Sequence, residues 1–305
     1  MPTLPRTPKD SLESMCRHFT VATARAPRTI RFYRESVGTV INVLEANGRH
    51  ALPWEITAKD VVWLLNYYNA KGMTVQTRKG YFSALRTWMH YYRNHAIDEV
   101  PVSWPADMRP NVDWLTLDQA QRLLALPMSP VQQLVIHCEL CLGMRRVEVL
   151  RLKVCGSFCG SYVDILGKGH QGGKPRRIPY HRNTAAAVDR YMAWRAGLVA
   201  MVKAARPSAA VPDALLIWAR GSRLYVYGAK GTGIDAIVKD LGRRIGYPSM
   251  SNHTLRRTFG RMMYRSGVEP ATIAKLLGHS SITSTLRYIG VDLDDMTQAM
   301  SAYEL

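Results

Sequence analysis

Two arginine-containing pairs in the second half of the chain have residue types and spacing suited to binding a phosphate group. Arg145 precedes Glu148 by three residues, so the guanidinium and the carboxylate would share one helical face. The carboxylate could then hold the guanidinium in position. His253 and Arg256 are also three residues apart and would point jointly into one cleft. Either pair alone is common by chance and would usually be structural.

Three further residues become informative only when they are considered together with these pairs. Lys168 lies between Gly167 and Gly169 at the tip of an expected hairpin, where a mobile lysine can reach a ligand, although most loop lysines are only solvated. His279 follows a helix stop, and Tyr288 lies nine residues further on. A lone histidine or tyrosine in such a place is more often a cap or a core residue.

Taken together, these residue types suit nucleophilic attack on a phosphodiester. The guanidiniums of Arg145 and Arg256 can meet the non-bridging oxygens as negative charge develops on them. A phenol has a reference pKa of about 10, so Tyr288 needs a proton acceptor and a positive field before it becomes a good nucleophile. His253 and the two arginines supply both.

The departing 5′ oxygen needs a proton, and Lys168 on its flexible turn is the candidate general acid. His279 would donate a hydrogen bond to the phosphate or help to shuttle the proton. The sequence has no Asp and Glu cluster suited to two Mg²⁺ ions and no Gly-rich nucleotide loop. We therefore expect neither a metal nor any other cofactor.

The order and spacing of these residues resemble the tyrosine recombinase family, which includes phage integrases and Xer-like recombinases. The family's Gly-Leu-Arg-x-x-Glu box is matched by residues 143–148, its His-x-Leu-Arg box by residues 253–256, and its Leu-Leu-Gly-His box by residues 276–279. Tyr288 falls where the family has its nucleophile. The likeness extends to the N-terminal helices and so covers nearly the whole chain.

The resemblance implies a mainly α fold with a small β-hairpin or sheet, in a two-domain architecture. It implies a site-specific recombinase that binds double-stranded DNA, forms a 3′-phosphotyrosyl intermediate and passes through a Holliday junction. It also implies a homo-oligomer, a dimer on one site and a tetramer in synapsis. A type IB topoisomerase-like enzyme and a non-catalytic DNA-binding module of the same fold are the alternatives.

Two features depart from the family pattern. The turn over residues 167–174 is longer than usual and carries a second lysine, Lys174, which competes with Lys168 for the role of general acid. Arg257 stands where many members have a histidine.

The composition points to a polyanionic partner. The 305 residues include 41 Lys and Arg against 23 Asp and Glu, which gives a formal charge of +18, and 47% of the residues are hydrophobic. A chain of this length and hydrophobicity can build two cores, which excludes a disordered or fibrous protein. The polar first 15 residues and the lack of a membrane-length apolar stretch indicate a soluble cytoplasmic, nucleoid-associated protein.

The elements that must position these residues follow from hydrophobic periodicity and capping signals. The first third reads as helices, around residues 30–48, 57–72 and 79–93. The last of these carries a basic stripe that is either a solvated face or a set of DNA contacts. The stripe consists of Lys79, Arg86, His90 and Arg93.

A proline-rich stretch over residues 95–114 marks a linker, so we expect a helical core-binding domain over residues 1–107 and a mixed α+β catalytic domain over residues 108–305. In the second domain, helix-start signatures occur at Thr116 and at Ser129.

The second domain also has strand signals. Strands are expected over residues 162–166, 177–180 and 215–219, with helices from residue 234 onward. Lys174 and Arg177, which border the hairpin turn, are further expected DNA contacts. The last segment, residues 291–305, either docks on a neighbouring subunit or packs on its own domain.

Five cysteines lie at positions 16, 138, 141, 155 and 159, an odd number that suits a reducing compartment. The spacing of the last four could serve a tetrahedral Zn²⁺ ion. Cys138 and Cys141 lie in an apolar helical run, however, which favours buried thiols, and we assign no metal to them.

Overall fold

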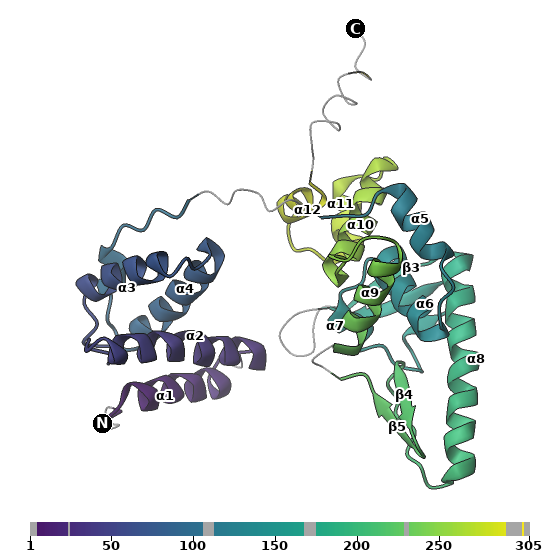
Figure 1. Ribbon diagram of the computed structural model, residues 1–305, viewed down its shortest axis with the longest axis horizontal. Helices are drawn as coiled ribbons and strands as arrows, with labels where there is room; N and C mark the ends of the chain where they lie inside the picture. Colours follow the sequence, from purple (N-terminus) through teal and green to yellow (C-terminus); the bar gives the residue numbers. More distant parts are fainter. Residues whose placement is uncertain are drawn as a thin grey trace. The chain divides into compact units, whose positions relative to one another are not determined.

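The computed structural model describes residues 5–23, 25–105, 113–167, 175–228, 232–290 and 301. The chain divides into two compact units, Met1–Pro110 and Asn111–Leu305 (Figure 1). The predicted domain boundary between residues 107 and 108 falls outside the described residues, so it stays a prediction. No helix in the described part of the chain is long and apolar enough to cross a membrane.

The first unit is helical, as its periodicity predicted. Its elements are α1 (Pro8–Val21), α2 (Pro27–Ala46), α3 (Ala58–Ala70), α4 (Val75–Tyr91) and the short 3-10 helix η1 (Ala96–Glu99). The expected capping pattern forms at the start of α3, where Thr57 and Asp60 each bond the backbone N–H of the other. Apolar side chains from all four α-helices, such as Met15, Val37 and Leu64, make one buried core.

The second unit combines helices with two small antiparallel sheets. Its helical elements are α5 (Leu117–Ala125), α6 (Pro130–Ile136), the π-helical turn η2 (His137–Cys141), α7 (Arg146–Val149), α8 (Arg182–Ala205), α9 (Thr232–Arg244), α10 (Asn252–Arg265), α11 (Pro270–Leu277) and α12 (Ile282–Ile289). Its strands are β1 (Phe158–Cys159), β2 (Tyr162–Leu166) and β3 (Pro175–Pro179) in one sheet, and β4 (Ile217–Arg220) and β5 (Arg223–Val226) in the other. The predicted mainly α fold with small β-sheets is confirmed.

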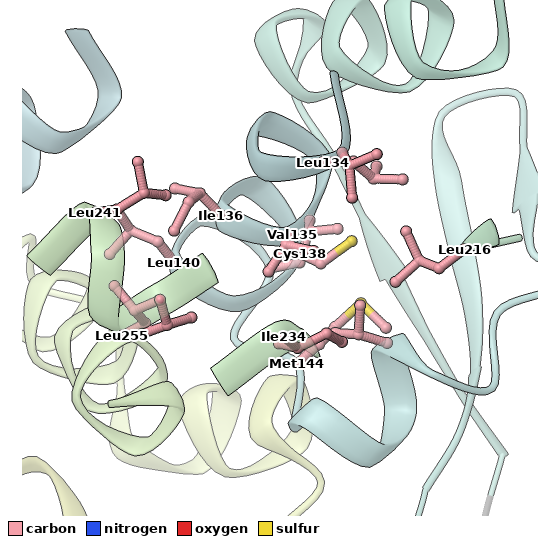
Figure 2. Close-up of a cluster of buried hydrophobic side chains, with 14 of the residues drawn as sticks. Leu134, Val135, Ile136, Cys138, Leu140, Met144, Leu216, Ile234, Leu241 and Leu255 are labelled. Atoms are coloured by element: carbon pink, nitrogen blue, oxygen red, sulfur yellow. The ribbon is translucent and has the colours of Figure 1, made fainter. Parts of the chain in front are cut away.

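The core of the second unit lies where α6, η2, α9 and α10 meet (Figure 2). Cys138 is one of its fully buried members, among Leu134, Ile234 and Leu255. Burial raises the pKa of the Cys138 thiol, and it raises the pKa of Cys141 to about 11. Cys138 is buried and Cys141 is partly buried against the same core, as expected for thiols in an apolar helical run.

The register of β2 and β3 decides which side chains face the interior. Val163 pairs with Ile178 and both are buried, whereas Asp164 pairs with Arg177 and both are exposed. Side chains alternate along a strand, so Arg176 lies on the opposite face from Arg177 and is directed inward. This alternation places one arginine of the hairpin in the site described next.

Candidate active site

The carboxylate of Glu148 is the centre around which the site is built. Glu148 is 1% exposed, and Arg145 donates to it twice, from its backbone N–H at 2.7 Å and from Nη1 at 2.9 Å. Arg176 donates to both carboxylate oxygens, at 2.7 and 2.8 Å. Burial alone would raise the pKa of Glu148, but the hydrogen bonds and charge of Arg176 and the Arg145 backbone hold it below its ordinary value.

Arg256 crosses the interior of the site from α10. Its Nη1 and Nη2 donate to the carbonyl oxygens of Gly143 and Leu277, and Nη1 lies 3.8 Å from a Glu148 oxygen. The side chain is 2% exposed. Burial, followed by the like charge of Arg145, lowers the pKa of Arg256 to about 10, so the guanidinium remains charged at neutral pH.

His279 is held between Arg256 and Thr285. Its Nε2 lies 3.3 Å from Arg256 Nη2, and its Nδ1 lies 2.9 Å from Thr285 Oγ1. A guanidinium can only donate, so Nε2 accepts and Nδ1 carries the proton that is donated to Thr285. Burial and the charge of Arg256 lower the pKa of His279 to about 4, so the ring is neutral at pH 7.

The backbone explains why the Leu-Leu-Gly-His segment ends in this place. Gly278 has φ of +64° and terminates α11 in the left-handed conformation, which brings His279 back toward α10. A Cβ at Gly278 would lie 3.1 Å from Arg176 Nη1, so the arginine packs closely against this turn. Arg176 Nε also donates to the carbonyl of Leu276 at 3.0 Å.

Tyr288 on α12 lies against the same cluster. Its ring packs edge-on to His279, with the centroids 5.1 Å apart, and the Cζ atoms of Arg256 and Arg257 lie 6.0 and 5.5 Å from the ring centroid. The hydroxyl is buried and has no hydrogen-bond partner among the described residues. Burial raises the pKa of Tyr288, while the positive charges of Arg256 and Arg257 act in the opposite direction.

His253 lies in the first turn of α10, one turn before Arg256. Ser251 is the N-cap of the helix, and its side chain and that of Thr254 form a capping box. His253 is exposed to solvent. Partial desolvation and the charges of Arg257 and Arg256 lower its pKa, so its ring can accept a proton at neutral pH.

The structure thus brings together Arg145, Arg256, His279 and Tyr288, with His253 on the adjoining turn. Lys168 and Lys174 lie outside the described residues. Arg177 points away from the cluster: its side chain makes a bidentate ion pair with Asp164 at 2.9 Å and packs on the Tyr162 ring at 3.8 Å.

Two members of the predicted basic stripe have an acidic partner within the first unit. Arg86 Nε lies 2.9 Å from one oxygen of Asp98, and His90 Nε2 lies 2.7 Å from the other. Arg93 follows the end of α4 with φ of +61°. The assignment of Lys79, Arg86, His90 and Arg93 to DNA contacts stays a prediction.

Sequence reasoning missed two side chains of the site, Arg176 and Thr285. The signal for Arg176 was its position two residues before Ile178 in an alternating strand, which marks it as inward-facing. Thr285 is fully buried and lies six residues after His279, in the helix that carries Tyr288. Nothing in the spacing alone distinguishes it from Thr283.

Comparisons with known proteins match most of the chain. The model of the phage integrase family matches residues 113–294, which include all three boxes and Tyr288. The tyrosine recombinase XerD of Listeria innocua is 21% identical over 299 residues, covering 92% of this chain and 94% of that protein. The tyrosine recombinase XerC of Roseiflexus sp. is 25% identical over 295 residues, covering 93% of this chain and 90% of that protein.

Solved structures show the same fold. The Tn1549 transposon integrase, solved in complex with transposon right end DNA, matches with a TM-score of 0.70 at 18% identity, covering 97% of this chain and 99% of that chain. The XerA recombinase matches with a TM-score of 0.52 at 20% identity, with the same coverage of each chain. The family match spans more than half of the sequence, and the chain therefore belongs to the phage integrase family, the tyrosine recombinases.

Proposed function

We propose that this protein is a site-specific DNA recombinase that cuts and rejoins strands through a covalent bond between Tyr288 and a 3′ phosphate. The observation that carries the proposal is the position of the Tyr288 phenol. Its buried hydroxyl has no partner among the described residues, and its ring lies beside Arg256 and His279 of the same chain. This arrangement supports attack in cis.

Arg145 and Arg256 would bind the non-bridging oxygens of the target phosphate. Both are fixed by Glu148, which accepts from Arg145 and lies 3.8 Å from Arg256. Guanidiniums that are already held in place stabilise developing negative charge without reorganising at the moment of reaction. Arg145 is 26% exposed, so its side chain is accessible to a ligand.

In the cleavage step the Tyr288 oxygen attacks phosphorus while the bond from phosphorus to the 5′ oxygen breaks. His253, whose lowered pKa leaves the ring neutral, would take the phenolic proton. Lys168 would protonate the departing 5′ oxygen, with Lys174 as the competing candidate. Rejoining is the reverse attack by a 5′ hydroxyl, so one phosphoester replaces another and no ATP is required.

His279 would assist at the phosphate. In the described state its Nε2 accepts from Arg256 and its Nδ1 proton is engaged by Thr285. It can donate to a phosphate oxygen only if Arg256 turns toward the phosphate and Nε2 gains a proton. The negative charge of a bound phosphate would raise the low pKa of His279 and so favour that protonation.

Double-stranded DNA is the proposed partner, with two protomers on one site and four in synapsis, where strand exchange passes through a Holliday junction. The charge of +18 supports this partner, as does the DNA in the structure of the Tn1549 integrase. The proposed contacts outside the reaction centre are Lys79, Arg86, His90, Arg93, Lys174 and Arg177. We place the protein in the cytoplasm, where it would act on the nucleoid.

The test is covalent trapping on DNA. The full chain is incubated with a library of random-sequence duplexes. Each duplex is nicked on one strand, so that the short fragment bearing the new 5′ hydroxyl diffuses away after cleavage. Wild-type protein should give an adduct that survives denaturing electrophoresis, and Tyr288→Phe should give none. Tyr264→Phe is the matched control, because Tyr264 packs on the same apolar cluster as Tyr288.

Each other outcome has a defined meaning. DNA binding without an adduct in the wild type would identify a non-catalytic module. Relaxation of supercoiled plasmid without sequence preference would identify a topoisomerase-like enzyme. An adduct that persists in Tyr288→Phe would remove Tyr288 from the role of nucleophile.

A further inference from the structure

A second cluster of reactive side chains lies in the first unit, in a chain segment that the reaction does not use. His90 at the end of α4, His95 before η1 and Asp98 within η1 each offer one ligand atom, and these atoms all lie within 4.8 Å of one another. His90 Nε2 is 2.7 Å, and His95 Nδ1 is 3.5 Å, from the same oxygen of Asp98. The two imidazole rings have centroids 4.5 Å apart.

We propose that His90, His95 and Asp98 form a binding site for a divalent transition-metal ion of the Zn²⁺ type. Two imidazole nitrogens and one carboxylate oxygen are a donor set that Zn²⁺ binds in tetrahedral geometry, with water as the fourth ligand. Mg²⁺ and Ca²⁺ prefer all-oxygen sites, which this cluster does not offer. The proposal does not rest on the recombinase function, although it shares His90 and Arg86 with the DNA contacts proposed above.

The separations of the donor atoms suit such an ion after a small adjustment. Ligands about 2.0–2.1 Å from a tetrahedral Zn²⁺ lie about 3.3 Å from one another. The His95–Asp98 separation of 3.5 Å is close to this value, and the His90–Asp98 separation of 2.7 Å must widen. The side chains of His90, His95 and Asp98 are 35%, 65% and 41% exposed, so they can adjust and an ion can enter.

The backbone and one further side chain hold the three residues in register. Arg93 adopts a left-handed conformation, the only non-glycine residue to do so in the described ranges, and its N–H bonds the carbonyl of His90 at 2.9 Å. The N–H of Asp98 bonds the carbonyl of His95 at 2.8 Å. Arg86 Nε donates to the other oxygen of Asp98 at 2.9 Å, in the way that outer partners orient a metal-binding carboxylate.

This site changes the interpretation of His90. The sequence placed His90 in a stripe of DNA contacts, but a nitrogen that binds a metal ion cannot also donate to a phosphate. Arg86 would then also belong to this site, because it holds the carboxylate of Asp98 in place. The ion would link η1 to the end of α4.

The experiment is a titration of the full, untagged, metal-free chain with Zn²⁺ by calorimetry. We expect one ion per chain whose affinity falls by more than about tenfold in His95→Ala and in Asp98→Asn, since even outer partners of a ligand contribute that much. His50→Ala is the matched control, because His50 lies 3.6 Å from Glu55 and no third potential ligand joins this pair within the described residues. The His50→Ala variant should bind Zn²⁺ with the same affinity as the wild type.

The exposed Cys155 is a competing ligand, and Co²⁺ distinguishes the two. Binding at the proposed site gives visible Co²⁺ absorption without the ultraviolet charge-transfer band of a cobalt thiolate. Absorption that His95→Ala removes supports the site. A thiolate band that Cys155→Ser removes, or Zn²⁺ affinity unchanged in His95→Ala, would overturn the proposal and leave a His–Asp hydrogen-bonded turn.

Discussion

Arg176 reaches from β3 to the buried carboxylate of Glu148 and donates to both of its oxygens, at 2.7 and 2.8 Å. Arg145 donates to the same carboxylate, and Arg256 lies 3.8 Å from it. A single acidic side chain therefore faces three arginines from three separate segments, and the four side chains together keep a net charge of +2. The guanidiniums that are proposed to bind phosphate depend on it for their positions.

Glu148→Gln should destabilise the protein strongly. The amide keeps the shape of the side chain but removes the charge that faces Arg176 and Arg256, and breaking a buried ion pair costs about 3–5 kcal/mol. The free energy of unfolding, measured by urea titration, should fall by that order. Asp164→Asn is the control, because the Asp164–Arg177 pair is exposed, so its removal should cost far less than the removal of the buried Glu148 charge. Equal losses in the two variants would contradict the central role of Glu148.

The low pKa of His279 predicts a loss of stability in mild acid. The folded protein holds the ring neutral with a pKa of about 4, whereas the unfolded chain takes up a proton below the ordinary value of 6.5. Stability from this group is therefore complete above pH 6.5 and is lost as the pH falls from 6.5 toward 4. The free energy of unfolding should therefore be measurably lower at pH 5 than at pH 7, by less than the full pKa shift would give, because solvent screens a partly exposed ring.

The measurement compares the free energy of unfolding at pH 7 and pH 5 in the wild type and in His279→Gln. His253 also has a lowered pKa and contributes in the same direction, so the variant should retain part of the slope. Glu148 does not add to this window, because its lowered pKa withdraws stability only at more acidic pH, below its ordinary value of 4.5. If both proteins lose the same free energy, His279 is not the group responsible.

Thr285 should matter through the orientation of His279. Thr285→Val preserves the shape of the side chain but removes the acceptor of the Nδ1 proton, which then lacks its 2.9 Å partner. The single-turnover cleavage rate should fall roughly tenfold or more, as for a misplaced proton-transfer group, with little change in DNA affinity. Thr283→Val, an exposed position on the same helix, should cleave normally. A fall in affinity that accounts for the whole effect would contradict an orienting role.

The features of the site that the sequence predicted are those fixed by local geometry. Arg145 and Glu148 are three residues apart and close their contact within one turn of α7. The position of Arg176 could not be predicted in the same way, because its partner Glu148 is 28 residues away and the pairing depends on how β3 packs beside α7. The same limit applies to Asp98, which lies eight residues after His90 and forms its contact across a turn.

Two of the differences between the predicted and the observed elements have clear physical causes. The long helix α8 was missed because its buried face includes Thr184 and Arg195, so hydrophobic periodicity is weak along it. β4 was placed two residues early, over 215–219 instead of Ile217–Arg220, because Leu215 and Leu216 are buried as well. A continuous apolar run carries no period from which the start of a strand can be determined.

Gly143 should tolerate no side chain. It has φ of +59°, and a Cβ would lie 2.4 and 2.8 Å from two atoms of the Phe259 ring. Its carbonyl accepts a hydrogen bond from Arg256, so any shift of this turn also moves a proposed phosphate-binding group. Gly143→Ala should therefore lower both the free energy of unfolding and the rate of DNA cleavage.

Gly156→Ala separates the backbone strain of a positive φ from the steric clash with Phe259. Gly156 has φ of +86°, but a Cβ there meets no atom within 4 Å, so this variant carries only the backbone strain of about 1–2 kcal/mol. Gly143→Ala should exceed it in urea unfolding, because the Phe259 ring must also move. Gly143→Ala should also cleave DNA more slowly under conditions where both variants are fully folded, since only Gly143 accepts a hydrogen bond from Arg256. Equal stability and equal cleavage in the two variants would show that the Gly143 turn holds Arg256 no more tightly than an open loop would.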